Sequence, residues 1–118
     1  AWFLLAELLL RTGRQEAVEG MVDVLAVLAD GLPSRLLELG SLLGELGRPA
    51  DALMHFLAAV RADPECAEAV YRVALFDEAN GELDRALAGY QRVIELAPRH
   101  AEGRARTVAL EAALAGGG

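Results

Sequence analysis

The sequence of 118 residues has one cysteine, few aromatic residues, and fewer basic than acidic side chains. A lone thiol, Cys66, cannot form an intrachain disulfide, so nothing in the sequence requires an oxidising compartment. The sequence has 11 basic and 18 acidic residues, so its net charge is −7, which argues against nucleic acid as a partner. With so few aromatics, the 54% hydrophobic fraction is mostly Leu, Ala and Val, and Ala and Leu favour helices.

Long hydrophobic runs are also scarce. The run from Trp2 to Leu10 is too short to span a bilayer, contains Glu7, and has no positive residue before it. It therefore predicts neither membrane insertion nor a secretory signal. The chain begins with Ala, and we interpret it as part of a longer, bacterial-type protein whose default location is the cytoplasm.

Convergent catalytic groups are missing from the sequence as well. The two histidines, His55 and His100, are far apart and have no ligand-like spacing to Cys66. A metal site made of Cys66, His100 and a nearby carboxylate is conceivable but is not predicted. No glycine-rich phosphate loop is present. We therefore predict no catalytic residue, no cofactor and no metal, and a protein that is not an enzyme.

What the sequence does contain is a regular period. Gly13, Gly47 and Gly81 are evenly spaced, and residues of related type follow each glycine at the same distances. The recurring sets are Val18, Ala52 and Ala86; Val22, Phe56 and Tyr90; Leu25, Ala59 and Val93. A fixed period of about 34 residues is typical of a repeat array.

Each period has the pattern of two helices joined at its glycine. In the middle period, apolar residues recur at helical spacing up to Leu46, and Gly47 can take the left-handed conformation that ends a helix. Pro49 suits the first turn of the next helix, which ends at Asp63-Pro64. A seventh helix is predicted over 100–114, followed by a frayed tail at 116–118.

These residues resemble the tetratricopeptide repeat, whose pattern is W-x2-L-G-x2-Y, then A-x3-F, then P. The matching segments are Trp2-x2-Leu5-Ala6-x2-Leu9, Leu36-x2-Leu39-Gly40-x2-Leu43, Val70-x2-Val73-Ala74-x2-Asp77, Ala52-x3-Phe56 and Ala86-x3-Tyr90, with Pro64 and Pro98 closing two repeats. The resemblance implies repeats at 1–32, 33–66 and 67–100 and a capping helix at 101–115. Asp77 departs from the pattern, and we expect Arg72 or Arg104 to pair with it.

The fold that this resemblance implies is all-α: one domain, residues 1–115, forming a right-handed superhelix of about seven antiparallel helices. Such arrays bind partners on a concave surface lined by the first helix of each repeat. The resemblance assigns nine residues to that groove: Phe3, Glu7, Leu37, Glu38, Ser41, Tyr71, Arg72, Leu75 and Arg106. It implies a protein-binding scaffold whose partner is an extended peptide or an amphipathic helix. Acidic C-terminal tails of chaperones are not expected, because the corresponding positions carry Glu7, Glu38 and Glu68.

The first helix suggests a further partner. It is apolar almost all the way round, which is typical of a helix covered on several sides. Either preceding repeats cover it, or two copies pair through Trp2, Leu4 and Leu8 as a homo-oligomer. The alternative functions are therefore a structural self-assembly module, or an accessory domain of a larger enzyme.

Overall fold

The computed structural model describes residues 2–116; the side chains of Trp2, Phe3, Leu10, Gln15 and Glu19 lie outside the description. The chain falls into two compact units, Ala1–Ala62 (unit 1) and Asp63–Gly118 (unit 2). Within the described residues there are seven α-helices and no strand. The predicted all-α class is therefore confirmed. The single superhelical domain that spans both units stays a prediction.

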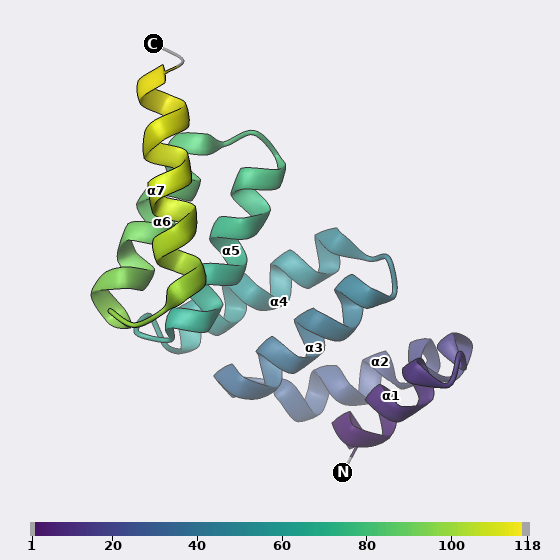
Figure 1. Ribbon diagram of the computed structural model, residues 1–118. Coiled ribbons are helices and arrows are strands. Elements are labelled where there is room, and N and C mark those ends of the chain that lie inside the picture. The colour runs from purple at the N-terminus through teal and green to yellow at the C-terminus, as the bar shows by residue number, and fades with distance from the viewer. Residues whose placement is uncertain (1, 117–118) are drawn as a thin grey trace. The chain divides into compact units, whose positions relative to one another are not determined.

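Unit 1 contains two helical hairpins (Figure 1). The first consists of α1 (Trp2–Arg11) and α2 (Gln15–Ala29), and the second of α3 (Pro33–Glu45) and α4 (Pro49–Ala62). The helix α3 packs against its partner α4 and also against α2 and α1 of the preceding hairpin. Consecutive pairs thus cover each other's apolar faces, as expected for stacked repeats.

Unit 2 contains one hairpin and a final helix. The hairpin is formed by α5 (Ala67–Ala79) and α6 (Leu83–Leu96), and α7 (Ala101–Gly116) packs against α6. The last helix begins at Ala101, where the capping helix was predicted to begin, and it continues through Gly116, which the sequence placed in a frayed tail. Residues 117 and 118, the rest of that tail, lie outside the described residues.

The three hairpin turns are built in the same way. Gly13, Gly47 and Gly81 have φ of 79°, 76° and 79°, the left-handed region that glycine adopts without a steric penalty. The following residue donates its N–H to a carbonyl five positions back, with N···O distances of 2.8, 2.8 and 2.9 Å for Arg14–Leu9, Arg48–Leu43 and Glu82–Asp77. This bond satisfies a carbonyl at the end of the helix. The turn prediction is confirmed at all three glycines.

Small residues let the paired helices approach closely. A Cβ placed on Gly40 of α3 would lie 2.5 Å from the ring of Phe56 on α4, and one on Gly89 of α6 would lie 2.8 Å from the Cβ of Ala74 on α5. Phe56 is 8% exposed and Tyr90 is fully buried. The two aromatics at the repeated position therefore both fill the core of their own hairpin.

Candidate protein-binding surface

The nine predicted groove residues lie on first helices of both units. Unit 1 holds Phe3, Glu7, Leu37, Glu38 and Ser41, and unit 2 holds Tyr71, Arg72, Leu75 and Arg106. The side chain of Phe3 lies outside the described residues, as does that of Trp2 from the predicted self-association set. The side chains of the other groove residues are all described.

In unit 1, one side of α3 carries an apolar side chain and a polar side chain, Leu37 and Ser41. Leu37 and Ser41 are one helical turn apart and half-buried, so both side chains lie on the same face of α3. Glu38 is exposed beside them, and its Oε2 lies 3.3 Å from Nη1 of Arg35. Glu7 of α1 occupies the position one repeat before Ser41 and is exposed. This stripe offers a leucine side chain next to carboxylates.

In unit 2, Tyr71 differs from the prediction. We expected it on the groove surface, but it is only 7% exposed and belongs to the core cluster of this unit. Its ring centroid lies 4.7 Å from that of His100 and 5.9 Å from that of Tyr90. The segment that leads into α7 covers Tyr71, so this side chain supports α7 and offers little surface to a partner.

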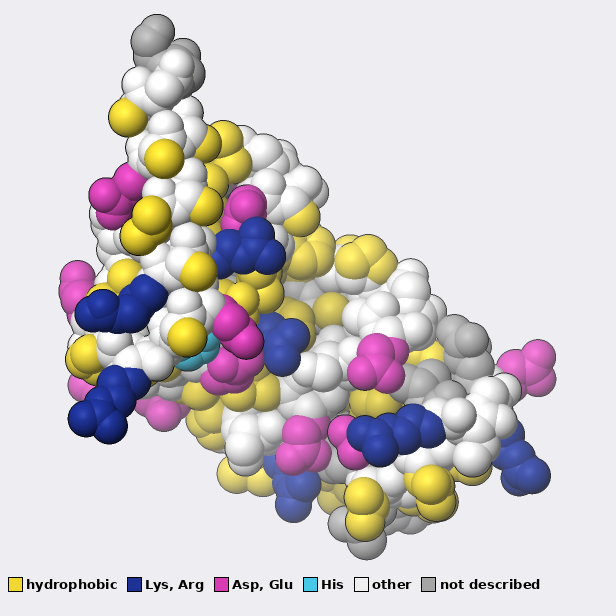
Figure 2. Space-filling view, in the orientation of Figure 1, with side chains coloured by type: hydrophobic (Ala, Val, Ile, Leu, Met, Phe, Trp, Pro, Cys, Tyr) yellow, Lys and Arg dark blue, Asp and Glu magenta, His cyan; other side chains and the backbone are white. Residues whose placement is uncertain are grey.

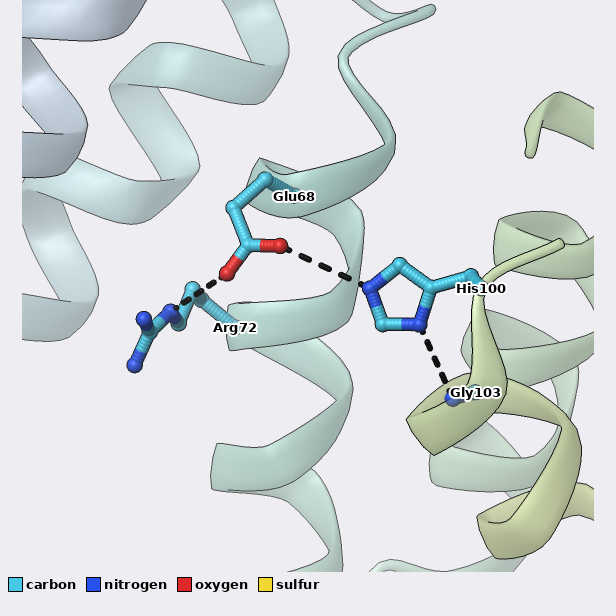
Figure 3. A network of polar contacts seen from close by, with 4 residues as sticks. All are labelled: Glu68, Arg72, His100 and Gly103. Atoms are coloured by element: carbon cyan, nitrogen blue, oxygen red, sulfur yellow. Dashed lines mark hydrogen bonds and ion pairs between the residues drawn. The ribbon is translucent and has the colours of Figure 1, made fainter.

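Arg72 is exposed and belongs to a polar network at the start of α5 (Figure 3). Its Nε donates to Oε1 of Glu68 at 3.0 Å, and the other oxygen of Glu68 lies 3.5 Å from Nε2 of His100. The N–H of Gly103 donates to Nδ1 of His100 at 2.9 Å. Because Nδ1 is the acceptor, Nε2 must carry the proton that faces Glu68. His100 thereby caps the first turn of α7 and ties it to α5.

A second network joins α5, α6 and α7. The Tyr90 hydroxyl donates to Oε1 of Glu78 at 2.6 Å, while Nη1 of Arg106 donates to Oε2 at 3.3 Å. Burial, followed by the hydrogen bond and negative charge of Glu78, raises the pKa of Tyr90. The same carboxylate raises the pKa of Arg106. Arg106 is thus an exposed cation held beside α5 by the carboxylate of Glu78.

Leu75 lies between these two networks on α5. It is half-buried and packs against the core cluster of unit 2. Leu75 is about one helical turn from Arg72 and about one helical turn from Glu78. The helix α5 therefore carries a cation, a leucine and a carboxylate along one side. This arrangement can accept an apolar side chain flanked by polar or charged groups.

Asp77 has a different partner from the one expected. Its Oδ1 lies 3.8 Å from Nη2 of Arg85 on α6, whereas Arg72 binds Glu68 and Arg104 donates to the carbonyl of Pro98 at 2.9 Å. Asp77 contacts Arg85 because the two residues are equally distant from the turn at Gly81 and therefore lie opposite each other on α5 and α6.

The described residues contain no group of three or more His, Cys, Asp and Glu side chains that could hold a metal ion. Cys66 is half-buried, and Nδ1 of His55 lies 2.8 Å from the carbonyl oxygen of Asp51. Among the helices described, none has the length and apolar character needed to cross a membrane.

The hairpins define an α-helical repeat protein, and residues 37–101, more than half of the chain, match a family model described as "Tetratricopeptide repeat". The chain belongs to the tetratricopeptide repeat family. The resemblance stated from the sequence is confirmed. No curated protein sequence matches the chain.

Several solved structures share the fold. The first tetratricopeptide domain of Spaghetti (RPAP3), bound to an HSP90 peptide, matches with a TM-score of 0.77 and 21% identity over 97% of this chain and 90% of that one. The Yersinia enterocolitica type III secretion chaperone SycD, in complex with a peptide of the translocator YopD, gives 0.76 and 20% over 93% and 89%. PcrH with the chaperone-binding region of PopD gives 0.68 and 20% over 98% and 86%. At these identities the likeness establishes the fold.

Proposed function

We propose that this chain is a non-catalytic protein-interaction module that binds an extended peptide or an amphipathic helix of a partner protein on the exposed sides of its first helices. Family membership supports this role, because helical repeat arrays use such surfaces for recognition. The related folds above were solved with peptides of other proteins bound. The location that we propose for it is the cytoplasm.

The observation that carries the proposal is the pair Arg72 and Arg106. These arginines occupy equivalent positions one repeat apart on α5 and α7, and their side chains are 42% and 48% exposed. Each is held by a carboxylate from α5, Glu68 for Arg72 and Glu78 for Arg106. Preorganised cations beside the half-buried Leu75 suit a peptide that inserts an apolar side chain and orients its polar groups by charge.

The charges also describe the partner. Because Arg72 and Arg106 already pair with carboxylates, unit 2 has little uncompensated positive charge on this side, and on the first helix of unit 1 the carboxylate of Glu7 is exposed. The exposed carboxylate would repel a strongly acidic segment. Such a segment would also find little uncompensated positive charge to attract it to this surface. We therefore propose a peptide dominated by apolar anchors, and we do not propose acidic chaperone tails.

The test begins with peptides selected on the purified chain from a random peptide phage library, whose affinity is then measured by calorimetry. Arg72→Glu is compared with Arg92→Glu, an arginine on α6 that is also about half exposed and also paired within its helix, with Glu95. We expect Arg72→Glu to weaken binding at least about tenfold and Arg92→Glu to leave it nearly unchanged. Equal affinities for both variants would overturn the proposal.

A further inference from the structure

The chain has two histidines, and their rings are hydrogen-bonded in opposite ways. Nδ1 of His55 lies 2.8 Å from the carbonyl oxygen of Asp51, which can only accept a hydrogen bond, so this Nδ1 carries a proton. Nδ1 of His100 accepts the N–H of Gly103 at 2.9 Å, so in the neutral ring this Nδ1 carries none. The two imidazoles therefore respond differently when a second proton is added.

Protonation leaves the contact of His55 intact, because the nitrogen that takes up the second proton is Nε2. In His100 the second proton must go to Nδ1, since Nε2 already carries the proton that faces Glu68. Both nitrogens of an imidazolium are donors, so neither orientation of the charged ring can accept the N–H of Gly103. The cap of α7 can therefore exist only while His100 is neutral.

The charged groups of α5 lie beside this ring (Figure 3). Oε2 of Glu68 is 3.5 Å from Nε2 of His100, and Oε1 of Glu68 accepts from Nε of Arg72. The ring of Tyr71 packs against the imidazole with a centroid distance of 4.7 Å. The side chain of His100 is 16% exposed, and Figure 2 shows histidine at the surface beside acidic side chains. Protons from solvent can thus reach the ring, and an imidazolium would form a charge-assisted bond with Glu68.

Other titratable side chains near this turn lie on α6, on α7 or in the segment between them: Tyr90, Arg99, Glu102 and Arg104. The hydroxyl of Tyr90 donates to Glu78, and Nε of Arg104 donates to a carbonyl of the segment before α7. Arg99 and Glu102 are exposed. The positive end of the α7 dipole also faces His100, because the first N–H groups of a helix point toward its start. An added proton is therefore repelled by α7 and attracted by α5.

We propose that His100 is a pH-sensitive link between α5 and α7. In its neutral form the ring joins both helices, because one nitrogen faces Glu68 and the other caps α7 at Gly103. In its charged form the ring stays on α5 and releases the first turn of α7. Histidine side chains change their charge between about pH 5 and pH 8, so mild acidification causes the release.

The released turn adjoins the proposed binding surface. Arg106, three residues after Gly103 on α7, is one of the two arginines of that surface, and Arg72 shares the carboxylate of Glu68 with His100. Acidification should therefore loosen the segment that leads to one arginine and add positive charge beside the other. An effect on partner binding rests on the proposed function, whereas the release of α7 does not.

Nuclear magnetic resonance of the labelled chain from about pH 8 to about pH 5.5 tests this proposal. Glutamate and aspartate side chains generally titrate below this range, so histidine dominates the response. The hydrogen-exchange protection of the Gly103 amide, corrected for the intrinsic rate at each pH, should fall at least about fivefold as the His100 ring titrates. The ring nitrogen shifts of His100 should show one proton, on Nε2, at the alkaline end and protons on both nitrogens at the acidic end.

Two variants isolate His100 as the cause. In His100→Asn the side-chain oxygen can accept the Gly103 N–H at every pH, so the protection should not change with pH. His55→Gln removes the other histidine and should respond like the unaltered chain. A Gly103 amide that keeps its protection while the His100 ring titrates would overturn the proposal, and so would an equal response to acid in His100→Asn. No peptide is needed, so the result is independent of the proposed function.

Discussion

The hydroxyl of Tyr90 donates a hydrogen bond of 2.6 Å to the carboxylate of Glu78, which joins α6 to α5 at the side where Arg106 reaches across from α7. Tyr90 is fully buried, and Glu78 is half-buried. This bond links the core of unit 2 to the proposed binding surface, because the same carboxylate positions the guanidinium of Arg106.

Removing the hydroxyl should destabilise unit 2. We expect Tyr90→Phe to lower the free energy of unfolding by about 1.5–3 kcal/mol, the range for hydrogen bonds to charged groups. Glu78→Gln keeps an oxygen acceptor for the hydroxyl and should cost less. Urea denaturation followed by circular dichroism measures both variants. A loss in Tyr90→Phe no larger than in Glu78→Gln would show that the bond contributes little.

The same contact predicts a loss of stability in alkali. Burial and Glu78 raise the pKa of Tyr90 above its usual value, so the folded state holds the phenolic proton more tightly than the unfolded state does. That stabilisation is fully present below about pH 10, where an unfolded tyrosine titrates, and is lost as the pH rises further toward the folded pKa. Unfolding free energies measured from neutral pH to above pH 10 should therefore fall more steeply for the unaltered chain than for Tyr90→Phe. Parallel curves would contradict this assignment.

The close approach of α3 and α4 predicts opposite effects for two neighbouring glycines. Gly40→Ala should destabilise the chain by about 1–3 kcal/mol, because its methyl group would overlap the buried Phe56 ring. Gly44→Ala, one turn later on the same helix, has no atom within 4 Å of the added Cβ and should stabilise it by up to about 1 kcal/mol. Thermal unfolding of the two variants gives the comparison, and equal shifts would refute the packing argument.

Substitutions of His100 should separate the hydrogen bond that caps α7 from the contact between the His100 and Tyr71 rings. His100→Ala removes the acceptor for the Gly103 N–H and should cost about 1 kcal/mol of stability. Asn is a favoured residue at this position, and His100→Asn should recover much of that loss. Amide hydrogen exchange at Gly103 reports the bond directly. Unchanged protection in His100→Ala would mean that the cap has no influence on the first turn of α7.

The turns and helices were predictable because each depends on local chemistry. Gly47 ends α3 in the left-handed conformation and Pro49 begins α4, and both signals are visible in the sequence. The burial of Tyr71 was not predictable, because His100 and Tyr90 cover it from distant parts of the chain. One signal was available and missed: a histidine three residues before Gly103 at the start of a helix is placed to act as a cap.

Some ion pairs across a hairpin could also be predicted from the sequence. Asp77 and Arg85 are each four residues from Gly81, and this symmetry indicates their contact once the turn is known. The bond between Glu78 and Arg106 spans 28 residues and has no such local signal. Groove positions taken from the repeat pattern therefore locate side chains on helices, but their pairing and burial depend on the neighbouring repeat.

The central claim, that partners bind along the first helices, is tested most directly by nuclear magnetic resonance of the labelled chain with a selected peptide. We predict that the methyl groups of Leu75 and the amide of Arg72 shift on titration, while the amides around Arg92 on α6 do not. Shifts confined to α6, with Leu75 and Arg72 unchanged, would contradict the account.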